Sequence, residues 1–123
     1  MLAERHRWER WGNLPGERRR LIDLIARTGA GRTLILSGDR HRAGLYRLAE
    51  ARVPRLIEAT SSSLNRSFDD PDETGPNQIG AMFGANNFGM IEIDWPAGLV
   101  TVSIRDENSV AQRAIAAPLA TPD

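Results

Sequence analysis

The strict alternation of apolar and polar residues near the C-terminus constrains the fold of this chain more than any other feature. Residues 91–95 read IEIDW and residues 100–105 read VTVSIR, so every second side chain is apolar. Successive side chains of a strand point to opposite faces, and each segment is therefore predicted to be a strand with one buried face. Pro96-Ala97-Gly98 supplies a turn between them. We predict an antiparallel β-hairpin at about 88–105, with a weaker third strand at 110–115.

A helix is predicted at about residues 15–28, after an irregular lead-in over residues 1–13. Pro15 suits the first helical turn, Asn13 is a candidate N-cap, and the glycine-rich residues 29–31 supply a stop. The expected buried stripe, at the spacing of one helix face, comprises Leu14, Leu21, Leu24, Ile25 and Thr28.

The middle of the chain is predicted to hold short strands. Residues 33–37 read TLILS, a continuous apolar run that favours a buried strand covered on both faces, as in α/β sheets. Further strands are expected at 43–48 and 55–60, and residues 66–80 have the composition of a surface loop. The predicted fold class is α/β.

Composition limits the function classes. A chain of 123 residues is long enough for one domain, and the lack of cysteine excludes disulfide scaffolds, thiolate metal sites and cysteine nucleophiles. No apolar run approaches the roughly 20 residues of a membrane span, and no signal peptide is recognisable. We expect a cytoplasmic protein by default, or a parent chain whose true start lies upstream.

Charge is distributed unevenly although the net charge is zero. The first 55 residues carry 13 arginines against 6 acids, and the remainder carries 3 arginines against 10 acids. A basic block can indicate nucleic-acid binding. Here no aromatic residues interleave with the arginines in the pattern of base stacking, so we favour a solvated face and expect no nucleic-acid partner.

The loop that follows residues 33–37 holds the best candidates for chemistry. Gly38 permits a sharp turn, and Asp39 and His41 bring a carboxylate and an imidazole close together. Both groups are ligands for divalent metals, and metal pairs act on phosphate esters. By itself this spacing is more typical of an exposed turn than of a metal site.

Five segments in order resemble one family. LILSGDRHRAGLYRL, LIEATSSSLNRS, NNFGMIEIDW and VTVSIRD, preceded by WERWGNLPGERRRLIDLI, are similar to the C-terminal part of PhoD-like metallophosphatases of the calcineurin-like superfamily. The resemblance extends from about residue 9 to about residue 106. It implies the C-terminal half of a β-sandwich flanked by helices. It also implies hydrolysis of phosphate mono- or diesters by water activated at a divalent or mixed-valence metal pair.

The resemblance assigns metal-site residues to two positions. The final family motif Gly-Asp-x-His is Gly38-Asp39-Arg40-His41 here, so Asp39 and His41 are the predicted metal ligands. The family's earlier motifs, which supply most ligands, are missing from this sequence, and we expect His6 to be solvent-exposed. Residues 1–123 are therefore interpreted as an incomplete domain that binds no metal stably alone.

Three other groups have a functional and a structural interpretation. The run Thr60–Ser63 can present hydroxyls to phosphate, or end a strand in a turn. Arg40 and Arg42 can clamp phosphate oxygens, or lie on a solvated surface. Trp8 and Trp11 can line a substrate pocket, although we favour packing over the helix start.

Two functions from different classes remain. The chain is either an inactive C-terminal fragment of a phosphoesterase, or a non-catalytic structural or interaction module derived from that fold. In both cases exposed strand edges predict self-association or pairing with a missing N-terminal half. We expect no membrane partner. The substrate of the complete parent would be a phosphate ester.

Overall fold

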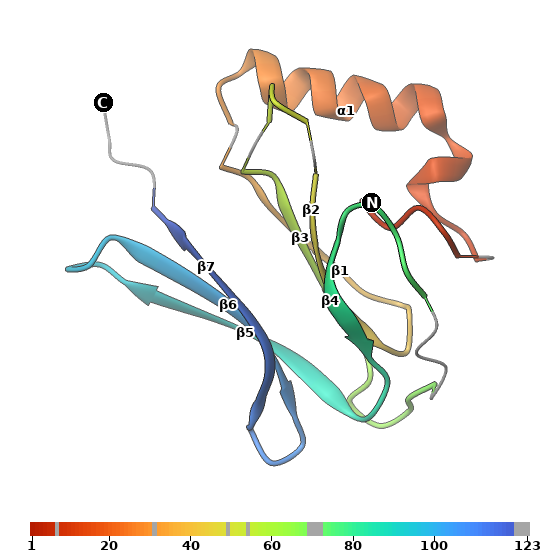
Figure 1. Ribbon diagram of the computed structural model, residues 1–123, viewed down its shortest axis with the longest axis vertical. Helices are drawn as coiled ribbons and strands as arrows, with labels where there is room; N and C mark the ends of the chain where they lie inside the picture. The colour runs from red at the N-terminus through yellow and green to blue at the C-terminus, as the bar shows by residue number, and fades with distance from the viewer. Residues whose placement is uncertain (7, 31, 49, 54, 69–72, 120–123) are drawn as a thin grey trace.

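A computed structural model describes residues 1–6, 8–30, 32–48, 50–53, 55–68 and 73–119. The elements form three layers: helix α1 lies over one face of a mixed sheet, and a second sheet packs at an angle against the other face (Figure 1).

The first sheet has the strand order β1-β3-β2-β4. β1 (Leu34–Ser37) pairs with β3 (Ile57–Ser61) in parallel, whereas β2 (Ala43–Arg47) pairs antiparallel with both β3 and β4 (Gln78–Phe83). The C-terminal ends of β1 and β3 therefore meet at one edge of the sheet, next to the loop that follows β1.

The second sheet confirms the predicted hairpin. β5 (Asn87–Asp94) pairs antiparallel with β6 (Leu99–Asp106), and β7 (Ala111–Pro118) adds the predicted third strand on the other side of β6. Ile91 lies opposite Val102, so the apolar positions of the two strands share one face.

The predicted helix is also confirmed, as α1 (Pro15–Arg27) after a 3-10 turn at Trp11–Asn13. Its buried stripe was predicted in part: Ile25 is buried and Leu21 packs against the core. Leu14 and Leu24 are exposed instead, and the buried Ile22 was missed. The expected cap was wrong as well, because the N-cap position is Leu14 and no side chain caps the helix.

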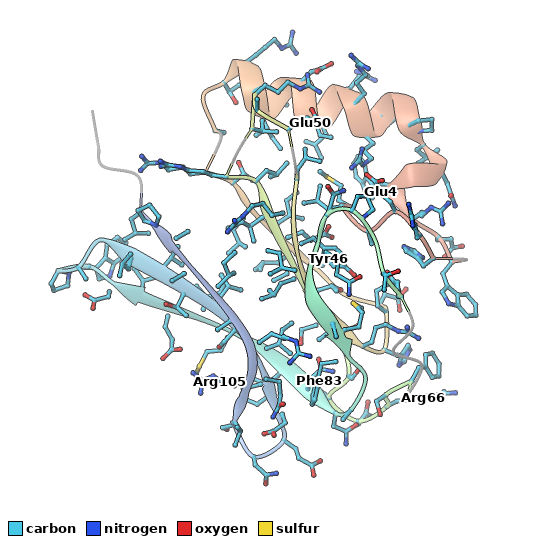
Figure 2. All side chains as sticks on the ribbon, in the orientation of Figure 1. Glu4, Tyr46, Glu50, Arg66, Phe83 and Arg105 are labelled. Atoms are coloured by element: carbon cyan, nitrogen blue, oxygen red, sulfur yellow. The ribbon has the colours of Figure 1, made fainter. Side chains whose placement is uncertain are left out.

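Apolar side chains form one core on each side of the first sheet. The core under α1 is made by Leu2, Ala3, Ile22, Ile25, Tyr46, Leu48, Val53, Leu56 and Met82. The core between the sheets is made by Ala43, Leu45, Ala59, Val102 and Ile104, with Phe83 of β4 packed against it (Figure 2). The alternation of β2 and β3 residues between these cores explains why both strands are buried on two faces.

The predicted fold class and two predictions about the middle of the chain need correction. The fold is mainly β rather than α/β, since the described residues contain one α-helix and two sheets. β1 is an edge strand and not a strand covered on both faces: Leu36 is 62% exposed. The predicted loop at 66–80 overlaps the start of β4 at Gln78, and its residues 69–72 lie outside the described residues.

In the described part of the chain, no helix has the length and apolar character needed to cross a membrane.

Candidate metal site

The loop between β1 and β2 has an uncommon backbone. Asp39 and His41 both have positive φ angles, 61° and 50°, in the left-handed region that residues with a Cβ rarely adopt. Aspartate and histidine tolerate this region better than most residues, but the conformation still costs about 1–3 kcal/mol per residue and needs support from its surroundings.

Ser62 supplies that support from the end of β3. Its Oγ accepts hydrogen bonds from the backbone N–H of Arg40 (2.8 Å) and of His41 (3.1 Å). Parallel pairing of β1 with β3 brings the two segments side by side, since Ser37 lies opposite Thr60. The serine run is therefore a strand end that holds the loop, which is closer to its structural interpretation than to a phosphate cradle.

The imidazole of His41 is oriented by a second loop. Its Nδ1 lies 3.0 Å from the carbonyl oxygen of Arg66, and the ring packs on Phe68 with centroids 4.7 Å apart. The backbone N–H of Phe68 donates to the carbonyl oxygen of His41 (2.8 Å). Because a carbonyl only accepts, the neutral ring carries its proton on Nδ1 and leaves the Nε2 lone pair available.

Asp39 completes the donor set that this loop offers. Its carboxylate is exposed and makes no hydrogen bond or ion pair with any described residue. One carboxylate and one imidazole are suitable ligand types for a divalent ion. No group of three or more histidine, aspartate, glutamate or cysteine side chains able to hold a metal occurs among the described residues. The donors fit a single weakly held ion and are too few for a metal pair.

The two arginines of the loop are engaged with a buried acid. Arg40 pairs with Glu73, and the guanidinium of Arg42 lies 3.9 Å from the same carboxylate. The hydroxyl of Tyr46 is 3.5 Å from Glu73. Burial, and then the negative charge of Glu73, raise the pKa of Tyr46 well above 10.0, so this tyrosine stays protonated. A phosphate clamp by Arg40 would have to displace Glu73.

His6 is buried, contrary to the sequence-based expectation that it is exposed. It is 9% exposed, and its Nδ1 has no hydrogen-bond partner among the described residues. Burial lowers the pKa of His6 below 6.5, and the positive charge of Arg40 lowers it further. His6 lines a polar cavity of about 210 Å³ together with Glu58, whose carboxylate accepts a hydrogen bond from the Ser37 hydroxyl (2.8 Å).

A second, outer cavity of about 460 Å³ opens over the loop. Its lining includes Trp8, Asp39, His41 and Phe68. The expectation that Trp8 packs over the helix start was wrong, because its indole is 70% exposed. Trp11 is less exposed, at 41%, and lies in the turn that leads into α1. The alternative interpretation of Trp8, as a wall of a pocket, is the one that agrees with its position.

The sequence located the loop but missed the residues that shape it. Ser62 was noted within its serine run, whereas the contacts of Arg66 and Phe68 with His41 were not foreseen. Phe68 did carry a signal, since it is an aromatic residue within an otherwise polar segment. Glu73 carried none, because nothing in the sequence pairs it with Arg40.

Comparison with known proteins gives no match to a protein-family model, to a curated protein or to a solved structure.

Proposed function

We propose that this chain forms the C-terminal part of a PhoD-like, metal-dependent phosphoesterase, in which Asp39 and His41 hold metal. The observation that carries the proposal is the Nδ1 contact of His41 with the carbonyl oxygen of Arg66, at 3.0 Å. Metal-binding histidines usually donate their second ring N–H to such an oxygen, which fixes the ring and leaves the other nitrogen free. The PhoD-like identity itself rests on the five sequence segments.

The arrangement of the loop assigns a task to each residue. Ser62 fixes the strained backbone, Arg66 and Phe68 fix the ring of His41, and Asp39 adds a negative charge one residue away from Arg40. A divalent ion at this position would act as a Lewis acid toward a phosphoryl oxygen. With two donors from this chain, the remaining ligands must come from elsewhere in the complete enzyme, so the chain alone is expected to be inactive.

We call residues 38–42, between β1 and β2, the metal loop. Paramagnetic broadening by Mn²⁺ tests whether this loop binds a divalent ion, without relying on activity. In an NMR titration of the labelled chain, we expect the amide signals of residues 39–41 to broaden at lower Mn²⁺ concentration than those near the exposed acids Glu92 and Glu107. Asp39→Asn or His41→Ala should abolish this preference. Equal broadening at the loop and at the surface acids would refute the proposal.

A phosphatase assay complements the titration. The chain is expected to show no turnover of a chromogenic phosphomonoester or diester with added divalent metals. Metal-dependent turnover that disappears in His41→Ala would overturn the inactivity and would mean that self-association completes the site.

A second candidate function, a non-catalytic interaction module, is favoured by the apolar side chains left exposed on β1 and β5. Leu36, Ile91 and Ile93 are each at least two-fifths exposed, and Trp95 follows them at the end of β5. Because β1 and β5 are edge strands, both offer unpaired backbone groups beside these side chains. Light scattering and the Mn²⁺ titration together separate the two candidates. Stable oligomers that show no preferential Mn²⁺ binding at the loop would favour the interaction module. Monomers without preferential Mn²⁺ binding would contradict both candidates.

A further inference from the structure

The outer cavity over the loop combines aromatic side chains with the candidate metal ligands. Trp8 and Phe68 belong to its lining together with Asp39, His41 and Glu9. Its volume of about 460 Å³ lies within the range of small-molecule sites. We propose that this cavity binds phosphate esters whose alcohol group carries a planar aromatic ring, with the ring stacked on Trp8. This substrate class rests on the proposed metal loop.

Trp8 is the natural platform for such a ring. Its indole is 70% exposed and makes no ring contact with another described aromatic residue. Phe68, by contrast, is already packed on His41, and the guanidinium of Arg66 lies 5.7 Å from its ring centroid. A ligand ring therefore stacks on Trp8, while Phe68 lines the cavity and keeps His41 in place.

The charged side chains of the cavity determine where the phosphate group of the ligand binds, relative to its aromatic ring on Trp8. Asp39 and Glu9 are exposed carboxylates in the lining, whereas Arg40 is paired with Glu73. Without metal the two exposed carboxylates disfavour the approach of a phosphate. A divalent ion on Asp39 and His41 reverses this, because its two positive charges offset the two carboxylates. Arg66 adds a cation beside Phe68 (its position is labelled in Figure 2).

We call the proposed stacking position on Trp8 the ring site. Because a divalent ion changes the charge of the cavity, fluorescence quenching with and without metal tests the ring site and the metal loop separately. Replacing Trp11 and Trp95 by phenylalanine leaves Trp8 as the single tryptophan, whose emission is followed separately from that of Tyr46. The probes are adenosine, adenosine 5′-monophosphate, phenyl phosphate and ribose 5-phosphate. Without metal, adenosine should quench Trp8 at lower concentration than its monophosphate. With Mg²⁺ the order should reverse, and ribose 5-phosphate should not quench under either condition.

Affinities measured by calorimetry then assign the ring to Trp8. Trp8→Ala should weaken binding of the monophosphate with Mg²⁺ by about tenfold, the scale of one lost stacking contact. Trp95→Ala is the matched control, because Trp95 is 74% exposed and lies in the other sheet's hairpin turn, away from the cavity. The tighter binder among the monophosphate and phenyl phosphate identifies a nucleoside or a simple aryl ester as the source of the ring.

Each outcome bears on one of the two proposals. If Mn²⁺ binds the loop but neither adenosine nor phenyl phosphate quenches Trp8, the ring site is overturned and the metal loop stands. If adenosine quenches Trp8 but Mg²⁺ leaves the order of the probes unchanged, the ring site stands and the metal loop is refuted. Equal weakening by Trp8→Ala and Trp95→Ala would also overturn the ring site.

Discussion

Replacing Ser62 by alanine should release the loop at residues 38–42 while leaving the rest of the fold intact. The hydroxyl oxygen of Ser62 accepts hydrogen bonds from two consecutive backbone N–H groups, those of Arg40 and His41. At about 1 kcal/mol for each hydrogen bond, Ser62→Ala removes about 2 kcal/mol of local stabilisation. The positive φ angles of Asp39 and His41 then lose the contact that offsets their strain.

Amide hydrogen exchange measures this loss directly. Since 1.4 kcal/mol corresponds to a factor of ten, protection of the amides of residues 40 and 41 should fall by about 10- to 100-fold. Amides at the turn end of the β5–β6 hairpin, where Ile93 lies opposite Val100, should keep their protection. Mn²⁺ should also lose its preference for the loop, because Asp39 and His41 no longer share a fixed geometry.

Ser63→Ala is the matched control for this experiment. Ser63 is the next residue along the chain and is buried. Its Oγ has no hydrogen-bond partner among the described residues, and its backbone contact with Asn87 does not need the side chain. Alanine at position 63 should be neutral or slightly stabilising. Unchanged protection of residues 40 and 41 in Ser62→Ala, or an equal loss in Ser63→Ala, would refute the role of Ser62.

Four further substitutions test the packing, the exposed face of β5 and the buried histidine. Gly44→Ala should destabilise the fold by about 1–3 kcal/mol in urea titrations, because a Cβ there would clash with the sulfur of Met82. Ile104→Ala should lower the free energy of unfolding by about 2–5 kcal/mol, whereas Ile93→Ala, which lies on the exposed part of the same face, should cost far less and should reduce self-association in light scattering. The pKa of His6 is below 6.5 in the folded state, so the unfolded chain takes up the proton first as the pH falls, and the free energy of unfolding should decrease below about pH 6.5. Thermal melts of His6→Gln should show a smaller decrease over that range. An equal decrease in His6→Gln would show that His6 is not the titrating group.

Elements with a local pattern could be predicted from the sequence, and elements that depend on distant partners could not. The hairpin at β5 and β6 follows from alternation along adjacent segments and from its turn, where the backbone N–H of Ala97 donates to the side chain of Asp94 (2.9 Å). β4 was missed because Gly80, with φ of 69°, interrupts the alternation that would mark it as a strand.

The burial of β1 illustrates the limit of an apolar run. The sequence of β1 fits a strand buried on both faces, and Ile35 and Leu34 do pack against the two cores. Leu36 does not, because β1 lies at the edge of the sheet and the second sheet does not extend over it. Strand order is a property of the whole topology, and a run of four or five residues carries no information on it.

The candidate site shows the same division between local and distant information. Asp39 and His41 are two residues apart, and the sequence sufficed to place them in one loop after β1. The burial of His6 was not predictable, because a polar local sequence gives no sign that residues 1–6 pack against β3 and β2. The charges that act on its ring, those of Arg40 and Glu73, also come from distant segments.

One additional strand, paired with the free edge of β1, would cover this edge and would also lie next to the loop that holds Asp39 and His41. β1 pairs with β3 on one side only, and its residues lead directly into Gly38 and Asp39. A strand paired with the free edge of β1 would cover backbone groups beside Leu36 and would bring its own side chains next to Asp39. Such a strand, from a second copy or from another polypeptide, would supply the burial that Leu36 lacks, and for the proposed metal it would add ligands beside Asp39 and His41. Leu36→Arg, which places a charge on that edge, should therefore weaken self-association and any gain of metal affinity together, whereas weakening of one without the other would show that the edge and the loop are independent.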